Sequence, residues 1–255
     1  MLENITPLVL TYNEEPNIAR SLERLRWARR VVVVDSQSMD RTVPLAAGFP
    51  NVELHSRPFD NHTAQWNFGV GLAATEWVLS LDADYILDDA FVAELRALQP
   101  ADDIDAYDAP FRYCLAGRRL RGSLYPPRAV LFRKSRCRYV ADGHTQLLDV
   151  PGKRLPLVSP IDHDDRKSLS RWFASQDKYA VLEAEKLSNA KPSELRLQDR
   201  LRLMLVPAPL VVLFYTLFVK GLILDGWHGW YYTLQRVTAE VMLSMRLVDR
   251  QLNDE

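Results

Sequence analysis

Cysteine is scarce in this chain of 255 residues, which contains Cys114 and Cys137 and no others. These two residues lack the close spacing of a metal-binding or redox pair, so neither a disulfide framework nor a cysteine-based metal site is indicated. A chain of this length can bury a sufficient core without cross-links. We therefore expect two reduced thiols in one large α/β domain, with or without an appendage.

An excess of charge of either sign is also missing, because 32 basic residues stand against 33 acidic ones and the net charge is -1. A surface for nucleic acid needs a clear basic excess, so we expect no nucleic-acid partner. A secretory leader is missing as well, since a strand-like segment follows Met1 almost directly. We therefore expect the chain to start in the cytoplasm.

The first eighty-five residues alternate between strand-like and helix-like segments. Apolar runs predict strands, and apolar residues at helical spacing predict helices. We expect strands over 5–11, 31–34, 52–55 and 76–82, and helices after 16, over 43–47 and over 62–74. This order predicts an α/β fold with an open, mostly parallel sheet.

The fourth expected strand ends in two carboxylates, Asp82 and Asp84. Side chains at i and i+2 of a strand share a face, so both can converge on one divalent cation, or on a cation and a ribose hydroxyl. Two carboxylates this close repel each other and need a partner such as Mg²⁺ or Mn²⁺. Most Asp-x-Asp pairs lie in solvated turns, but this pair follows a buried strand, at the edge where open α/β sheets bind ligands.

Residues 106–160 do not continue this alternation, and instead contain short strand-like segments separated by glycine, proline and basic residues. We expect these segments, at 107–114, 129–133, 138–141 and 146–150, to form the second wall of a cleft. An amphipathic helix over 168–187 follows, with Ser168 as its cap. A polar hinge at 188–193 leads to the last part of the chain.

Residues 203–219 contain no charge and lie at the lower limit of the roughly 17–25 residues that a helix needs to span a bilayer. Pro207 and Pro209 interrupt this run and remove backbone donors that lipid cannot replace. An aromatic cluster of the kind found at headgroup depth follows, at Trp227, Trp230, Tyr231 and Tyr232. We therefore predict a helix that lies in the membrane interface or re-enters the same leaflet, rather than a full span; the alternative is a buried helix pair that covers the sheet or a dimer interface.

Four motifs in the first ninety residues resemble those of the inverting family 2 glycosyltransferases of the GT-A fold. They are Leu10-Thr11-Tyr12-Asn13-Glu14-Glu15, Val32-Val33-Val34-Asp35-Ser36 with Asp40-Arg41-Thr42, Gln65-Trp66-Asn67-Phe68-Gly69 and Leu81-Asp82-Ala83-Asp84. The chain is further similar to bacterial enzymes that add sugars to lipopolysaccharide core or related envelope glycans. The segments that match these bacterial enzymes also include Phe132-Arg133, His163 and Leu224-Asp225-Gly226-Trp227-His228-Gly229.

The resemblance implies a site for a nucleotide-diphosphate sugar, with UDP as the expected nucleotide. The implied donor-binding residues are Thr11, Tyr12, Asn13, Glu14, Asp35, Asn67, Asp82 and Arg166. The implied metal ligands are Asp82, Asp84 and His163, holding Mg²⁺ or Mn²⁺ against the departing diphosphate. Asn13 and Asp35 could equally be ordinary turn and cap residues.

Several basic residues could meet the diphosphate. Arg166 follows His163 in a run, 162–167, that could also be a polar helix start. Arg128 and Arg133 flank a strand-like segment and could bind an anionic acceptor or diphosphate, although arginines at strand ends are common on protein surfaces.

An inverting transfer also needs a general base to take the proton of the acceptor hydroxyl. By resemblance, this base is a carboxylate in the second half of the domain, and the candidate stretch is 140–146. Related enzymes often have a His-Glu pair where this chain has His144 and Thr145. Asp142 is the first candidate, His144 the second, and a solvated turn aspartate is the alternative.

We expect a glycosyltransferase domain over 1–190, with a nucleotide-sugar half at 1–100, an acceptor half at 101–165 and a helix at 166–190. Amphipathic and apolar helices would fill 191–255. The enzyme would transfer a hexose to a lipid-linked or lipopolysaccharide-type acceptor at the cytoplasmic face of the cell membrane, as a peripheral or monotopic protein.

Two other functions stay open. A nucleotidyltransferase acting on a sugar phosphate would favour a glycine-rich, basic loop after the first strand, but this chain has Tyr12, Asn13, Glu14 and Glu15 there. A catalytically inactive, membrane-associated scaffold is compatible with the altered pair at 144 and 145. The intact Asp82 and Asp84 argue against a scaffold.

Overall fold

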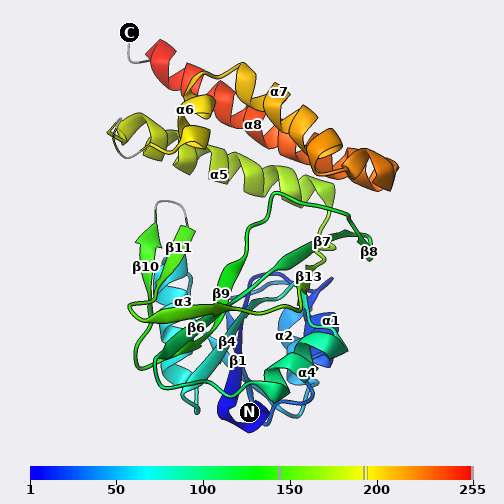
Figure 1. The fold of residues 1–255 in the computed structure, drawn as a ribbon, viewed down its shortest axis with the longest axis vertical. Helices are drawn as coiled ribbons and strands as arrows, with labels where there is room; N and C mark the ends of the chain where they lie inside the picture. Colours follow the sequence, from blue (N-terminus) through cyan, green and yellow to red (C-terminus); the bar gives the residue numbers. More distant parts are fainter. Residues whose placement is uncertain (143–144, 192, 194, 254–255) are drawn as a thin grey trace. The chain divides into compact units, whose positions relative to one another are not determined.

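The computed structural model describes residues 1–142, 145–191, 193 and 195–253 (Figure 1). The chain forms two compact units, one of residues 1–117 and 125–166, the other of residues 118–124 and the chain from 167 onward. This division differs from the boundary predicted at residue 190. Helix α5 (Leu169–Asn189) belongs to the second unit, because its Ala184 and Leu187 pack with Leu243 and Leu247.

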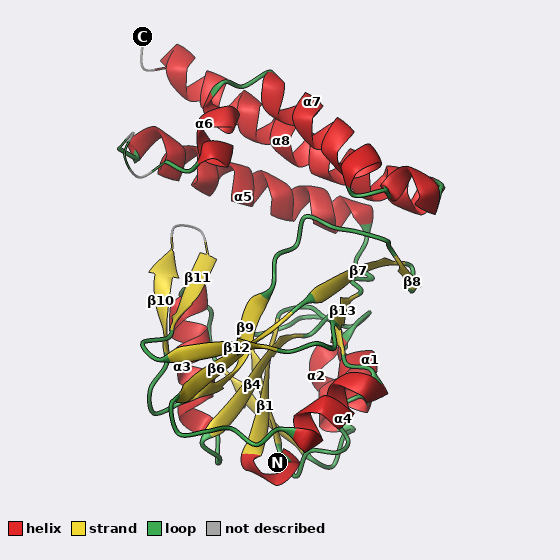
Figure 2. Ribbon diagram, viewed as in Figure 1, coloured by secondary structure: helices red, strands yellow, loops and turns green. Residues whose placement is uncertain are grey.

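The first unit is built on a seven-stranded sheet (Figure 2). In sheet order, its strands are β12 (Lys153–Pro156), β6 (Ile104–Ala109), β9 (Arg128–Arg133), β4 (Trp77–Asp82), β1 (Ile5–Thr11), β2 (Val31–Asp35) and β3 (Val52–Ser56). β1 is parallel to β2 and β4, β2 to β3, and β12 to β6, whereas β9 is antiparallel to both β4 and β6. The predicted open, mostly parallel α/β sheet is confirmed.

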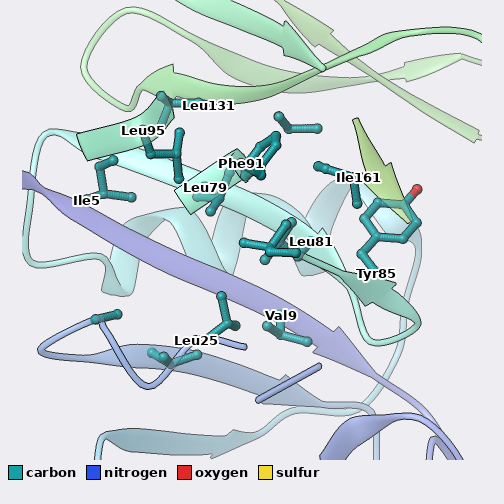
Figure 3. Close-up of a cluster of buried hydrophobic side chains, with 14 of the residues drawn as sticks. Ile5, Val9, Leu25, Leu79, Leu81, Tyr85, Phe91, Leu95, Leu131 and Ile161 are labelled. Carbon is teal, nitrogen blue, oxygen red and sulfur yellow. The ribbon is translucent and has the colours of Figure 1, made fainter. Parts of the chain in front are cut away.

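Helices cover both faces of this sheet. They are α1 (Ile18–Glu23), α2 (Thr42–Ala47), α3 (His62–Leu72) and α4 (Asp89–Ala97), preceded by the short helix η1 (Leu2–Asn4). One core joins the strands to α1, α2 and α4, with members such as Val9, Leu81 and Phe91 (Figure 3). The other core joins alternate strand residues, such as Leu8 and Val34, to α3. The run of valines at 31–34 supplies both cores, as expected of a strand buried on both faces.

The prediction of a single strand over 107–114 is wrong, because Pro110 divides this segment into two strands. β6 ends at Ala109, and β7 (Phe111–Leu115) belongs to a small second sheet with β13 (Ile161–His163) and β5 (Tyr85–Ile86). Proline lacks the N–H donor that would continue the ladder of β6. A separate hairpin, β10 (Arg138–Asp142) and β11 (Thr145–Asp149), packs on α3.

The second unit is helical. Besides α5, it contains α6 (Leu197–Leu203), α7 (Pro207–Phe214), the π-helical turn η2 (Tyr215–Val219), the short helix η3 (Leu222–Asp225) and α8 (Trp227–Asn253). Helices α5 and α7 both pack against α8 (Figure 1). Residues 118–124, which include the short strand β8 (Arg118–Arg119), also belong to this unit, and we call them the strap.

The uncharged run at 203–219 is broken rather than continuous. Helix α6 ends at Leu203, Leu205 has a left-handed backbone with φ of 65°, and α7 begins at Pro207. Proline is tolerated here because the first turn of a helix does not use its N–H donors. Throughout the part of the chain that the structure describes, no helix is both long and apolar enough to cross a membrane.

Candidate functional site

The carboxyl ends of β1, β2 and β4 lie side by side at one edge of the sheet. In the register of these strands, Thr11 pairs with Asp35 and Leu10 with Asp82. The chain leaves β1 toward β2 on one side and later returns to β4 on the other side. Ligands of open α/β sheets bind at such a switch point.

Asp35 is buried at the end of β2 and organises the loop that follows it. The hydroxyl of Thr11 donates to Asp35 Oδ1 at 2.9 Å, and the backbone N–H of Ser38 donates to Oδ2 at 2.8 Å. The Ser38 hydroxyl donates to Oδ1 as well, at 2.5 Å. Both carboxylate oxygens therefore hold the loop, and a contact of Asp35 with the nucleoside stays a prediction.

The loop after β1 is joined to the loop after β2 by reciprocal hydrogen bonds. The N–H of Asn13 donates to Ser38 Oγ at 2.7 Å, and Asn13 Oδ1 accepts from the N–H of Met39 at 2.7 Å. The N–H of Glu14 donates to the Thr42 hydroxyl at 2.6 Å. Asn13 adopts a left-handed φ of 53°, which asparagine tolerates better than most residues. The two loops thus form one fixed rim, from which the exposed ring of Tyr12 projects.

Asp82 is the last residue of β4, Asp84 lies just beyond it, and the two carboxylates influence each other. Burial and the negative charge of Asp84 raise the pKa of Asp82. A hydrogen bond from the Tyr85 hydroxyl and the positive charges of Arg128 and His163 oppose this rise. The two carboxylates therefore disfavour each other's ionisation, which is the mutual repulsion expected of so close a pair.

His163 lies in β13, between β5 and β7 of the small sheet, where it pairs with Tyr85 of β5 and Tyr113 of β7. Its Nε2 atom is 3.2 Å from Asp84 Oδ2. Burial alone would lower the pKa of His163, but the charge of Asp84 and the hydrogen bond to it raise the pKa above its usual value. The rings of Tyr113 and Tyr125 each lie 4.9 Å from the His163 ring, centroid to centroid, and fix its orientation.

Asp84 and His163 could supply part of the ligand set of a divalent cation. An imidazole nitrogen and a carboxylate oxygen stand together at His163 and Asp84, and the Nδ1 atom of His163 is buried without a hydrogen-bond partner among the described residues. Among those same residues, no group of three or more His, Cys, Asp or Glu side chains is arranged to hold a metal ion. A cation here would complete its shell with water or phosphate oxygens, which is how Mg²⁺ is commonly held.

Arg128 lies closer to this edge than the sequence indicates. It is the first residue of β9, which runs antiparallel to β4, so it stands at the end of β4 that carries Asp82. Its Cζ atom is 4.7 Å from the centroid of the Tyr125 ring. The Tyr125 hydroxyl lies 2.5 Å from that of Tyr85. The antiparallel register was the signal needed to place Arg128 in the site, and the sequence does not reveal it.

Arg166 is engaged with a neighbouring carboxylate. Its Nη2 atom is 2.8 Å from Asp164 Oδ2, which Arg20 of α1 also approaches at 2.5 Å. The Arg166 N–H donates to Asn17 Oδ1 at 3.0 Å. This network ties the segment after His163 to α1, and the contact of Arg166 with phosphate stays a prediction.

Asn67 of α3 is a clamp for the hairpin. Its side-chain amide donates to the Tyr139 carbonyl and accepts from the Tyr139 N–H, both at 2.9 Å. The hairpin strand β10 ends at Asp142, the first candidate for the base. The second candidate, His144, lies outside the described residues. Asn67 therefore holds the backbone of β10, and its contact with the nucleotide sugar stays a prediction.

Comparisons with known proteins bear on the family of this chain. The profile described as "Glycosyl transferase family 2" matches residues 8–152. An uncharacterized glycosyltransferase of Rickettsia conorii is 29% identical over 108 residues, which are 42% of this chain and 38% of that protein. The lipopolysaccharide core biosynthesis glycosyltransferase LpsC of Rhizobium meliloti is 29% identical over 104 residues, or 39% and 38% of the two chains. The chain thus spans well under half the length of these relatives.

Two solved structures share the fold. The mannosyltransferase PcManGT from Pyrobaculum calidifontis, in complex with GDP-Man and Mn²⁺, has a TM-score of 0.54 at 16% identity, over 99% of this chain and 88% of that one. The S. aureus protein TarS 1-349, in complex with UDP-GlcNAc, has a TM-score of 0.51 at 13% identity, over 98% and 92%. At these identities the likeness shows the GT-A type of α/β fold alone. Because the family profile covers more than half of the sequence, this chain belongs to glycosyl transferase family 2.

Proposed function

We propose that this protein is a metal-dependent, inverting glycosyltransferase that transfers a hexose from a nucleotide-diphosphate sugar, with UDP as its nucleotide. The observation that carries the proposal is the placement of His163 against Asp84, beside Asp82, at the carboxyl edge of β4. An acidic cluster with an imidazole at a sheet's switch point suits a cation and the diphosphate that it binds.

The donor would be held between the rim and the carboxylates. The fixed loops of Asn13 and Asp35 offer backbone and side-chain groups to the nucleoside, and Asp82 can accept from a ribose hydroxyl. PcManGT and TarS, which share the fold, bind GDP-Man and UDP-GlcNAc respectively. These two complexes support a nucleotide-sugar donor for this chain.

Asp84 and His163 would hold the divalent cation, Mg²⁺ or Mn²⁺. When bound, such a cation supplies positive charge to the diphosphate as it departs from the anomeric carbon. The guanidinium of Arg128 stands at the same strand end and would add a fixed positive charge. The tyrosine rings around His163 keep the imidazole in place.

An inverting reaction places the acceptor hydroxyl on the face of the sugar opposite the diphosphate. A base must take the hydroxyl proton as the new glycosidic bond forms and the bond to the diphosphate breaks. We assign this role to Asp142 at the end of β10, with His144 as the second candidate. The clamp between Asn67 and the backbone of Tyr139 would position this strand for the acceptor.

The acceptor would be lipid-linked or of the lipopolysaccharide type, and the enzyme would work in bacterial envelope glycan synthesis at the cytoplasmic face of the cell membrane. The similarity to LpsC supports this acceptor class. The exposed apolar side chains of the second unit support an acceptor that is presented at a membrane.

Thermal unfolding tests the donor site directly. UDP with Mn²⁺ should raise the melting temperature of the full chain, and Asp84→Asn should remove this shift. A screen of nucleotide sugars for transfer or hydrolysis would then identify the donor, and NMR of the product would establish the anomeric configuration. A chain that no nucleotide diphosphate stabilises, or one that releases pyrophosphate from a nucleoside triphosphate and a sugar phosphate, would contradict the proposal.

A further inference from the structure

The hairpin that ends β10 at Asp142 is not part of the main sheet. Across the residues that the structure describes, β10 and β11 pair with each other and with no strand of the two larger sheets. A two-stranded hairpin is at best marginally stable by itself. The place of this hairpin relative to the seven-stranded sheet is therefore set by side chains rather than by a backbone ladder.

Tyr139 reaches from β10 into the core between the hairpin, α3 and the seven-stranded sheet, and it is only 7% exposed. Its ring stacks on Trp66 of α3 at 5.3 Å between centroids and lies edge-on to Phe132 of β9 at 5.8 Å. Its hydroxyl donates to Ser80 Oγ of β4 at 2.8 Å. One side chain of the hairpin thus contacts a helix and two strands of the sheet.

Ser80 is a polar residue within the apolar run of β4 from Trp77 to Leu81, and it is buried. Its hydroxyl accepts from Tyr139 and donates to the Val130 carbonyl of β9 at 3.3 Å. A buried hydroxyl is unfavourable unless it is hydrogen-bonded. The two hydrogen bonds offset that cost and link three strands, β10, β4 and β9.

This link lies next to the candidate site. Ser80 and Asp82 are two positions apart in β4, and Val130 and Arg128 are two positions apart in β9, so the members of each pair share a face. Val78, on the same face of β4, belongs to the core that includes the hairpin. The hairpin therefore covers the face of β4 to which Asp82 belongs.

The Tyr139 hydroxyl keeps its proton and acts as the donor. Burial raises the pKa of Tyr139, and the charge of Asp82 adds to this rise, although the hydrogen bond to Ser80 opposes it. The hydrogen bonds therefore run in one direction, from Tyr139 to Ser80 and from Ser80 to Val130.

We propose that Tyr139 is a positioning residue whose hydroxyl, held by Ser80, sets the distance between the hairpin and the carboxyl end of β4. Asp142 is three residues further along β10, about 10 Å in extended chain. A shift of the hairpin at Tyr139 would also move Asp142, and a misplacement of about 1 Å can lower a rate on the order of 100-fold. This inference deepens the proposed function, on which it rests for the roles of Asp82 and Asp142, by naming a residue that aligns the acceptor side with the donor side.

The hydroxyl can be removed without disturbing the other contacts of the hairpin. Asn67 binds the backbone of Tyr139 and joins the hairpin to α3. The stack on Trp66 uses the ring alone. Tyr139→Phe therefore breaks the hydrogen bond to β4 and keeps both the clamp and the stack.

Nuclear magnetic resonance of the full chain with UDP and Mn²⁺ tests the position of the hairpin, because bound Mn²⁺ broadens the signals of nearby amides and the effect falls steeply with distance. In Tyr139→Phe, an outward shift of about 1 Å, the size that matters to a reaction, should weaken the broadening of β10 amides about twofold. The broadening of β1 amides should stay the same. Tyr107→Phe, at a buried tyrosine of β6, is the matched control and should change neither.

Hydrogen exchange without nucleotide measures the strength of the anchor. The amides of β10 and β11 should exchange about fivefold faster in Tyr139→Phe, the usual effect of one hydrogen bond. Ser80→Ala should have a larger effect, because it leaves the Tyr139 hydroxyl buried without this acceptor, whereas Tyr139→Phe leaves Ser80 bonded to Val130. Ser80→Ala combined with Tyr139→Phe should therefore exchange more slowly than Ser80→Ala alone.

The outcomes separate positioning from simple stabilisation. Hairpin amides that keep their wild-type exchange and broadening in Tyr139→Phe would overturn the proposal. Faster exchange with unchanged broadening would overturn it too, because the bond would then stabilise the hairpin without setting its position.

The thermal shift produced by UDP with Mn²⁺ is measured in parallel for each variant. A chain that shows this shift but an unaltered hairpin in Tyr139→Phe refutes the positioning role alone. A wild-type chain without the shift refutes the proposed donor site, and with it the positioning role that depends on that site.

Discussion

The Nε2 atom of His163 lies 3.2 Å from Oδ2 of Asp84, although the two residues are far apart in the sequence. The strand pairing explains this contact. β13 pairs with β5 directly after Asp84, and the N–H of Asp164 donates to the Asp84 carbonyl at 3.0 Å. The late part of the unit thus returns to the sheet edge and adds a basic group to the acidic pair.

Asp84→Asn should reduce transfer at least about 100-fold and abolish the thermal shift produced by UDP with Mn²⁺. The substitution keeps the shape of the side chain but removes the charge that a cation and His163 require. Asp89→Asn is the matched control, because the Asp89 side chain is 97% exposed and pairs only with Arg24 among the contacts described. Equal thermal shifts for wild type and Asp84→Asn would contradict the proposal that Asp84 binds a divalent cation.

Arg128→Gln should lower kcat about 100-fold, the usual effect of removing one group that stabilises a leaving anion, with little change in melting temperature. The reason is the position of Arg128 at the strand end beside Asp82, over the Tyr125 ring. Arg128→Lys should recover part of the loss, because lysine keeps the charge but stacks less well on tyrosine. Steady-state kinetics with Arg29→Gln as the control would measure this, and an unchanged kcat would exclude Arg128 from catalysis.

Asn67→Ala should destabilise the protein by about 1–3 kcal/mol, since two hydrogen bonds to the Tyr139 backbone are lost together. Hydrogen exchange should increase at the amides of β10 and β11 more than at those of β1. Asn4→Ala, at an exposed position, is the control and should change neither quantity. If exchange in the hairpin stayed at the wild-type level, Asn67 would not be the clamp.

Much of the secondary structure is predictable from sequence because its signals are local. The valines at 31–34 and the apolar run before Asp82 specify buried parallel strands by their composition, and Ser168 does cap α5 by accepting from the N–H of Arg171. The acidic pair is equally visible, because its two members are neighbours in the chain.

The parts that the sequence does not reveal depend on pairing between distant segments. The placement of Arg128 requires the antiparallel register of β9 with β4, and the strap requires the approach of Gly122 to Lys220. Helix α5 has a clear amphipathic pattern, but the pattern does not say which element covers it. Its membership of the second unit follows from packing with α8.

Gly69→Ala and Gly71→Ala should have opposite effects on stability, although both lie in α3. A Cβ atom at Gly69 would lie 2.5 Å from Leu8 Cδ1, and Leu8 is completely buried in β1. A packed core cannot absorb that overlap cheaply, so Gly69→Ala should cost about 1–3 kcal/mol. At Gly71 a Cβ atom meets nothing within 4 Å, so alanine should stabilise the helix by up to about 1 kcal/mol. Chemical denaturation of the two variants measures the difference, and equal stabilities would show that α3 does not rest on β1 as closely as the structure has it. That closeness matters for function, because α3 also carries Asn67 and so sets the position of the hairpin relative to the sheet edge.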